Sequence, residues 1–163
     1  MDILICVEIP RNSPQKYEFD EKLKMIKLDR TLFSSVYFPF EYGFIKETKS
    51  EDWDPLDAVL LATFPTFPGC YVKARPIGAI MMEDEKGIDN KIIAVPDDKV
   101  DPRFREIKDI NDLSSHAKKE IKEFFKTYKT LEPGKWVKVK EFRSKEKAEK
   151  MVEEARKRFK KES

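Results

Sequence analysis

The sequence has few of the residues on which most enzyme sites rely. It contains one histidine, His116, and two cysteines, Cys6 and Cys70. These counts exclude a cysteine-rich zinc site, a disulfide framework and a histidine-rich metal site, and we expect the two cysteines to be reduced thiols. A Ser–His–Asp triad would have to use His116, which lies in a charged helical pattern with no nucleophile elbow nearby. Carboxylates, amines, guanidinium groups and phenols remain to carry chemistry.

Glycine and long apolar runs are also scarce. The five glycines form neither GxxxxGK nor GxGxxG, so a P-loop and a dinucleotide-binding fingerprint are absent. No uncharged apolar run approaches the ~18 residues of a membrane span. The first residues, which reach Glu8 almost at once, lack the basic start and apolar core of a signal peptide. We therefore predict a cytoplasmic protein without a membrane partner.

Charge of both signs is abundant in this chain. There are 33 Lys plus Arg and 31 Asp plus Glu among 163 residues, and the formal net charge is +2. Because the two signs nearly cancel, no global field favours nucleic acid or an anionic membrane as a partner. A hydrophobic content of 40% argues against disorder. The length predicts one domain, residues 1–163, large enough to bury a full core.

Periodicity divides the chain near residue 100. Before it, short β-rich runs alternate with turn residues, and a polar turn at 20–22 predicts a hairpin. After it, an apolar stripe over 117–128 predicts a helix capped by Ser114 or Ser115 and ended by Pro133-Gly134. Ser144 is expected to cap a second helix. The predicted strands cover 3–9, 16–19, 25–28, 43–46, 58–62, 71–82, 91–95 and 136–139. This pattern predicts an α+β, β-rich fold, a small β-barrel with two main helices.

Three aspartates, Asp52, Asp54 and Asp57, surround Pro55 just before the buried run 58–61. In an extended segment Asp52 and Asp54 would point the same way, and a turn at Pro55 could bring Asp57 to the same cavity. Clustered carboxylates repel one another unless cations neutralise them, and Mg²⁺ suits such oxygen ligands. The alternative is an acidic surface turn, but the proline, the third aspartate and the adjoining strand favour a metal site.

Two further groups of charges could join this site. The acidic stretch 83–91 either forms a charged hairpin loop around Gly87 or supplies metal ligands from a neighbouring strand end. Charged side chains also occur among apolar residues of the first strands, where each taken singly would be an outward-facing strand residue. Gathered at the mouth of a small barrel, they would bind metal ions and phosphate groups together. These residues are Glu8, Lys16, Glu18 and Arg30.

Taken together, these residues closely resemble the family I soluble inorganic pyrophosphatases. The distinctive motif is Asp52-Trp53-Asp54-Pro55-Leu56-Asp57, which is similar to the DxDPxD signature of that family. Supporting matches run in order from Val7-Glu8-Ile9-Pro10 to Gly134-Lys135-Trp136 and cover almost the whole chain. The resemblance implies an OB-like five-stranded β-barrel with flanking helices.

The resemblance also implies Mg²⁺-dependent hydrolysis of pyrophosphate to two phosphates, by direct in-line attack of a metal-bound water or hydroxide. Several Mg²⁺ ions would serve each site, with Mn²⁺ or other divalent ions as substitutes, and the chain would form a homohexamer. Asp54 would act as general base, and Tyr42 would support Asp54 or the leaving-group side. The implied metal ligands are Asp52, Asp57, Asp84, Asp89, Glu8 and Glu18. The implied substrate-binding residues are Lys16, Arg30, Tyr42, Lys91, Tyr128 and Lys129.

The sequence departs from the family pattern at one position and leaves other roles open. Phe38 stands where many bacterial relatives have a phosphate-binding tyrosine, and the adjacent Tyr37 would point elsewhere. Tyr128 also lies on the apolar stripe of its helix, so a packing role is an alternative to substrate binding. His116 could lie at a subunit contact or at a solvated helix position.

Two other functions are alternatives to pyrophosphate hydrolysis. The first is a metal-dependent phosphohydrolase for nucleotides or polyphosphates. The second is a binding module, because OB-like barrels often bind single strands through stacked aromatics in a basic groove. The expected groove is dense in aspartate, so we predict no nucleic-acid partner.

Overall fold

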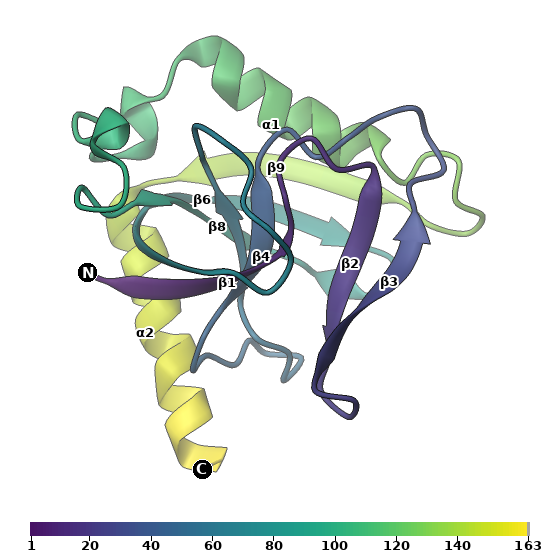
Figure 1. Cartoon of the computed structure of the whole chain (residues 1–163), viewed down its shortest axis with the longest axis horizontal. Helices are drawn as coiled ribbons and strands as arrows, with labels where there is room; N and C mark the ends of the chain where they lie inside the picture. The colour runs from purple at the N-terminus through teal and green to yellow at the C-terminus, as the bar shows by residue number, and fades with distance from the viewer. Residues whose placement is uncertain (163) are drawn as a thin grey trace.

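The computed structural model describes residues 1–162, and its centre is a closed ring of five strands (Figure 1). Neighbours in the ring follow the order β1, β4, β5, β8 and β6, and β6 pairs back with β1. The pair β5–β8 is parallel and the other ring pairs are antiparallel. The fold is therefore the predicted OB-like barrel. The bounds are β1 Ile3–Ile9, β4 Glu41–Ile45, β5 Asp57–Leu60, β6 Tyr71–Asp84 and β8 Lys91–Pro96.

Four further strands lie outside the ring. β2 (Gln15–Asp20) and β3 (Met25–Thr31) form a separate two-stranded sheet, which is the predicted hairpin. β7 (Gly87–Ile88) and β9 (Val137–Arg143) both pair with the end of β6. The acidic stretch 83–91 is thus a β6–β7 hairpin, in which Gly87 adopts a positive φ of 121°.

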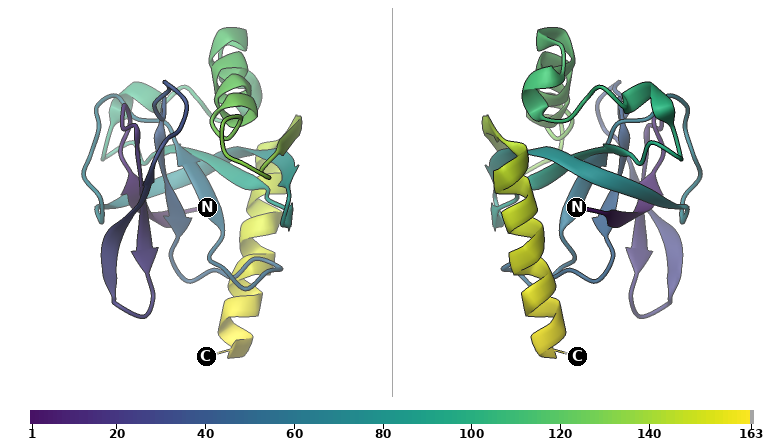
Figure 2. Two further views of the ribbon diagram at one scale, coloured as in Figure 1. Left: turned by 90° about the vertical axis from the view of Figure 1, so that its right-hand side faces the viewer. Right: turned by 90° about the vertical axis from the view of Figure 1, so that its left-hand side faces the viewer.

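Two helices cover different parts of the barrel (Figure 2). The helix α1 (Ser115–Thr127) packs on β9, whereas α2 (Lys145–Glu162) packs on β6. Two short 3-10 helices, η1 (Pro102–Phe104) and η2 (Ile110–Asp112), were not predicted. None of the helices among residues 1–162 combines the length and apolar character that crossing a bilayer needs.

Alternate residues of the ring strands point to two apolar clusters. Val59 and Ile93 belong to the cluster that includes Phe124 and Phe125 of α1. The next residues along the same two strands, Leu60 and Ala94, belong to the cluster that includes the buried alanines and Val152 of α2. Side chains alternate across a strand, so each helix covers one face of the barrel wall and both faces are buried.

The ends of the predicted helices were only partly correct. The Ser114 hydroxyl accepts a hydrogen bond from the Ala117 N–H at 3.1 Å, which confirms the N-cap. The helix ends at Thr127 rather than at Pro133-Gly134, because residues 128–135 turn more tightly. In that segment the N–H of Glu132 donates to the carbonyl of Lys129 at 2.9 Å.

Gly43 of β4 lies where two backbones approach most closely. A Cβ at this position would come within 1.9 Å of the Cys6 carbonyl oxygen on β1. That oxygen belongs to a paired barrel strand and has little freedom to move. The contact between β1 and β4 therefore requires glycine.

We expect Gly43→Ala to lower the free energy of unfolding by about 3 kcal/mol or more, because backbone must shift to admit the methyl group. Urea unfolding followed by circular dichroism would measure this loss. Gly134→Ala is the control, since Gly134 has φ 74° but open space around it; it should lose only about 1 kcal/mol. Equal losses in the two variants would contradict the steric explanation.

Candidate active site

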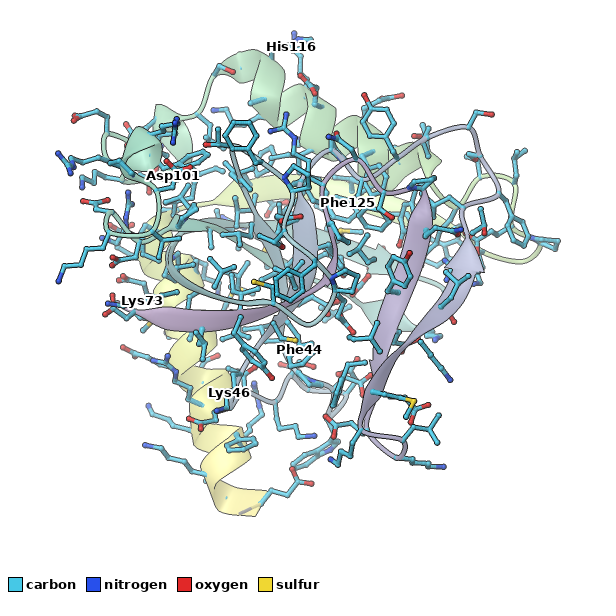
Figure 3. All side chains as sticks on the ribbon, viewed as in Figure 1. Phe44, Lys46, Lys73, Asp101, His116 and Phe125 are labelled. Carbon is cyan, nitrogen blue, oxygen red and sulfur yellow. The ribbon has the colours of Figure 1, made fainter. Side chains whose placement is uncertain are left out.

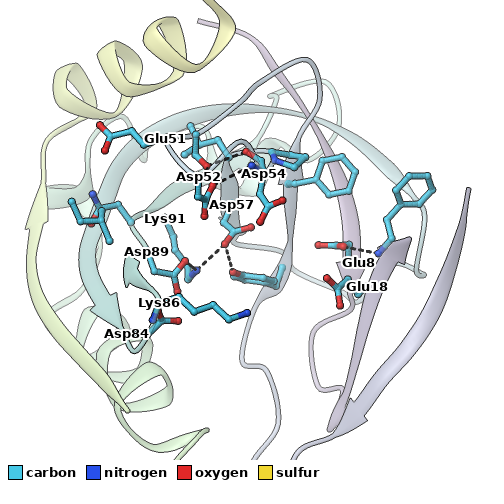
Figure 4. A pocket seen from close by; sticks show the side chains of 18 of the residues that line it. Glu8, Glu18, Glu51, Asp52, Asp54, Asp57, Asp84, Lys86, Asp89 and Lys91 are labelled. Carbon is cyan, nitrogen blue, oxygen red and sulfur yellow. Dashed lines mark hydrogen bonds and ion pairs between the residues drawn. The ribbon is translucent and has the colours of Figure 1, made fainter. Parts of the chain in front are cut away.

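A cavity of about 980 Å³ opens between the β2–β3 hairpin, the ends of β5, β6 and β8, and α2 (Figure 4). Asp52, Asp54 and Asp57 lie between Glu8 and Glu18 on one side and Asp84 and Asp89 on the other. The cavity walls include every residue that the sequence placed in the site. These are Glu8, Lys16, Glu18, Arg30, Tyr42, Asp52, Asp54, Asp57, Asp84, Asp89, Lys91, Tyr128 and Lys129.

The aspartate loop is a tight turn and not the extended segment considered from the sequence. Trp53 has a positive φ of 70°. Asp52 Oδ1 accepts hydrogen bonds from the Ser50 hydroxyl and from the Asp54 N–H, the latter at 3.1 Å. The Ser50 N–H in turn donates to the Asp54 carbonyl at 2.8 Å. These local hydrogen bonds form a ring similar to an Asx turn, and the turn directs the carboxylates of Asp52 and Asp54 to the cavity.

Lys91 places a buried ammonium group between two carboxylates. Its Nζ lies 2.9 Å from Asp57 Oδ2 and 2.7 Å from Asp89 Oδ1, and the residue is 2% exposed. The Tyr42 ring lies 5.3 Å from the same nitrogen. Burial alone would lower the pKa of Lys91, but the attraction of Asp57 and Asp89 outweighs it and raises the pKa. Lys91 is therefore a permanent cation inside the barrel end.

Tyr42 donates its hydroxyl hydrogen bond to Asp57 Oδ2 at 2.9 Å. This hydrogen bond goes to Asp57 and not to Asp54, in a β4–β5 register that sets Phe44 opposite Asp57. The other implied role of Tyr42, support of the leaving-group side, stays a prediction. Burial, followed by the negative charge of Asp57, raises the pKa of Tyr42 well above its ordinary value. The phenol consequently remains a protonated donor.

A second internal ion pair lies on the other side of the site. Lys129 Nζ is 3.0 Å from Asp84 Oδ2. Burial opposes the charge of Lys129, but Tyr128 and Asp84 together raise its pKa. The tight turn that follows α1 is what directs this lysine to Asp84.

Several carboxyl groups in the cavity are harder to ionise than usual, even with these lysines nearby. Burial raises the pKa of Glu8 to about 7, although its carboxylate accepts the Phe19 N–H. Burial and the neighbouring Asp52 and Asp57 raise the pKa of Asp54. Asp89 also has a raised pKa, because its burial and the repulsion of Asp57 exceed the attraction of Lys91.

This donor set fits hard divalent cations. Carboxylates that repel one another in a partly buried cavity are the oxygen ligands that Mg²⁺ prefers. Within residues 1–162, no three acidic, histidine or cysteine side chains already form a closed metal cage. Lys91 and Lys129 occupy positions between the carboxylates, so an ion entering there would share Asp57, Asp84 or Asp89 with a lysine.

The residues left open by the sequence now have definite surroundings. Phe38 is buried, and its ring centroid lies 4.6 Å from that of Phe124. Tyr37 is exposed and so points elsewhere as predicted, although it lies in the connection before β4 and not on a strand. Tyr128 packs on Phe124 with a centroid separation of 5.0 Å, which confirms the packing role; it also lines the cavity, and its binding of substrate stays a prediction. His116 points outward from α1 and pairs with Glu120 (Figure 3).

Sequence reasoning assigned no role to four other residues near this site. Lys135, Lys147 and Arg158 line the cavity. Glu132 lies behind it and binds Arg30 and Lys135. The only local signal is the spacing of Glu132 and Lys135 on either side of Pro133-Gly134. The approach of Arg30, 102 residues away in the chain, leaves no sequence signal.

Comparison with known proteins gives a consistent result over the whole chain. The family model for inorganic pyrophosphatase matches residues 5–160. The inorganic pyrophosphatase of Nanoarchaeum equitans is 49% identical over 161 residues, which cover 99% of each chain. That of Saccharolobus solfataricus is 48% identical over 160 residues, or 98% of this chain and 89% of the relative.

Solved structures agree with the sequence relatives. The inorganic pyrophosphatase of Helicobacter pylori superposes with a TM-score of 0.95 at 45% identity, covering 98% of this chain and 94% of that one. The enzyme from Thermus thermophilus gives the same TM-score and identity, with 98% and 91% covered. On these matches and on the acidic cavity at the barrel end, the chain belongs to the inorganic pyrophosphatase family.

Proposed function

We propose that this protein is a hydrolase that converts pyrophosphate to two phosphates with the help of Mg²⁺. The observation that carries the proposal is the composition of the cavity, which combines seven carboxylates of the predicted site with Lys16, Arg30, Lys91 and Lys129. A polyanion needs cations for its oxygens, and divalent ions need oxygen ligands. One cavity offers both.

The resemblance to the family assigns the carboxylates to different metal ions. Asp52, Asp57 and Asp89 would hold the first Mg²⁺, and Asp57 would also contact a second. Asp84 would join Asp89 in holding an ion that arrives with substrate, whereas Glu8 and Glu18 would act through water. When bound, such ions screen the charge of pyrophosphate and lower the pKa of water. Mn²⁺ and other divalent ions are expected substitutes.

Asp54 is the group that we assign to proton transfer. It lines the cavity beside Asp52 and Asp57, and it makes no ion pair within 4.0 Å among residues 1–162. Its raised pKa moves it toward the range in which a carboxylate can accept a proton from an attacking water. Because Asp57 is bound by Lys91 and Tyr42, Asp54 is the freer carboxylate of the two.

The cations would bind the phosphoryl oxygens and stabilise the charge that develops on the departing phosphate. Lys16, Arg30, Lys91, Tyr128 and Lys129 are the residues that we assign to this role. Lys91 and Lys129 already contact carboxylates, so phosphate oxygens would share their N–H groups with Asp57, Asp89 and Asp84. Each ammonium has three N–H donors, which makes such sharing possible.

Replacing Asp54 tests the assignment of the base. We expect Asp54→Asn to lower kcat for pyrophosphate with Mg²⁺ by roughly a hundredfold or more, because general-base catalysis contributes about 10²–10⁴-fold. Phosphate release measures the rate, and EDTA should abolish it in the parent protein.

Asp2→Asn is the matched control, because Asp2 pairs with Lys73 outside the cavity; it should retain the parental rate. Parallel assays with ATP and tripolyphosphate test the broader phosphohydrolase. A parent protein that releases no phosphate from pyrophosphate would contradict the function, and a fast Asp54→Asn variant would contradict the base.

Glu8 makes the stability of the metal-free protein depend on pH. Its pKa rises from 4.5 to about 7 on folding, so between these values the folded chain binds more protons than the unfolded chain. The free energy of unfolding should therefore fall as pH rises through this window. In urea unfolding with EDTA, the fall in the free energy of unfolding should be smaller in Glu8→Gln than in the parent protein by about 3–4 kcal/mol, at ~1.4 kcal/mol per pKa unit. Identical pH profiles for the two proteins would show that Glu8 titrates normally.

We also propose that residues 1–163 act as one domain and assemble as a homohexamer. The assembly is inferred from the resemblance to prokaryotic-type members of the family. Light scattering coupled to gel filtration should then give a mass six times the 19.2 kDa of the chain. A monomeric mass at micromolar concentration would be evidence against the hexamer.

A further inference from the structure

Glu132 is a buried carboxylate that lies directly behind two cations of the cavity wall. The residue is 4% exposed. Its Oε1 lies 2.8 Å from Arg30 Nε and 2.9 Å from Lys135 Nζ, and its Oε2 accepts a hydrogen bond from Arg30 Nη2 at 3.1 Å. Among the described residues, Arg30 and Lys135 line the cavity and Glu132 does not. The carboxylate therefore contacts the two cations from outside the cavity.

The two cations come from different parts of the fold. Arg30 lies on β3 of the hairpin, whereas Lys135 follows the tight turn after α1. Like charges brought this close repel each other unless an anion separates them. Burial would raise the pKa of Glu132, but hydrogen bonds from Lys135 and Arg30 lower it on balance, so the carboxylate is charged.

A second carboxylate completes the arrangement on the other side of Arg30. Asp29 Oδ2 accepts a hydrogen bond from Arg30 Nη1 at 2.5 Å and lies 3.6 Å from Lys16 Nζ. Charges thus alternate from Lys16 through Asp29, Arg30 and Glu132 to Lys135. Each terminal nitrogen of Arg30 uses one N–H on a carboxylate, and a guanidinium has two N–H groups on each such nitrogen.

We infer that Glu132 is a positioning residue, which fixes Arg30 and Lys135 in the orientation that presents them to a phosphoryl group in the cavity. The inference rests on the proposed function, in which pyrophosphate binds there. Because Glu132 does not face the substrate, it acts on binding through the two cations. Holding them in place before the substrate arrives reduces the freedom that they lose on binding.

Glu132→Gln removes the charge and keeps the shape of the side chain. We expect the KM for magnesium pyrophosphate to rise about tenfold, the equivalent of one charge-assisted hydrogen bond of ~1.4 kcal/mol, while kcat stays within about twofold. Glu132→Asp, which keeps the charge on a shorter side chain, should show a smaller rise in KM and serves as a second variant if Glu132→Gln does not fold.

Glu83→Gln is the control, because Glu83 also binds two lysines, Lys140 at 3.2 Å and Lys138 at 3.9 Å, but on the surface. Its KM should match that of the parent protein. In an Arg30→Lys, Lys135→Gln background, Glu132→Gln should change KM by less than about twofold, because the groups that it positions are altered or gone. An unchanged KM in the single Glu132→Gln variant, or an equal loss of kcat and of affinity, would overturn the inference.

Binding measured without turnover separates this inference from the proposed function. In the Asp54→Asn background, calorimetry with pyrophosphate and Mg²⁺ should show an affinity about tenfold weaker when Glu132→Gln is added. If the parent protein binds pyrophosphate without hydrolysing it, the proposed function fails while this difference in affinity still decides the role of Glu132. Equal affinities with and without Glu132→Gln would overturn the inference.

Discussion

The site is organised around the two buried ion pairs that the ammonium group of Lys91 makes with Asp57 and Asp89. β5 and β8 are parallel neighbours with Ala58 opposite Ile92, so Asp57 and Lys91 begin the two strands side by side. Beyond them both strands are buried. A charge at such a place is stable only when it is paired, and removing one partner leaves the other uncompensated. The register of the apolar core therefore decides which charges meet at its edge.

The same constraint explains why the carboxylates of the site are only partly neutralised by its lysines. Lys91 and Lys129 neutralise part of the acid cluster, yet Glu8, Asp54 and Asp89 still have raised pKa values. The remaining repulsion among the carboxylates favours the binding of further cations. Divalent ions would reduce this repulsion while the lysines stay in place. In the proposed function, a substrate that brings its own negative charge would then meet lysines whose positions are already fixed. Attraction for metal and attraction for phosphate would thus arise from one set of ion pairs.

The sequence predicted the elements of this arrangement better than their contacts. Short β-rich runs separated by turn residues were sufficient for the ring strands, and Ser114 for the start of α1, because these signals are local. The motif around Pro55 was sufficient to bring its aspartates to one cavity. The positive φ of Trp53 was not predicted, since it depends on hydrogen bonds from Ser50 and Asp54 to one carboxylate oxygen. The bond from Tyr42 to Asp57 and the ion pair of Arg30 with Glu132 depend on tertiary approach, for which a single sequence has no signal.

The β2–β3 hairpin shows how stability and function share the same contacts. A two-stranded sheet is marginally stable by itself, and this one is not part of the barrel sheet. Near its turn it is joined to the barrel by the Phe19 N–H, which donates to Glu8, and by the contact of the Phe19 ring with Phe44. Near its other end Arg30 binds Glu132. The wall that carries Lys16, Glu18 and Arg30 is therefore attached at both ends partly by carboxylates. Of these carboxylates, Glu8 lines the cavity and Glu132 supports the cations of its wall. A change in the charge of either carboxylate therefore alters the position of the hairpin as well as the electrostatic field in the cavity.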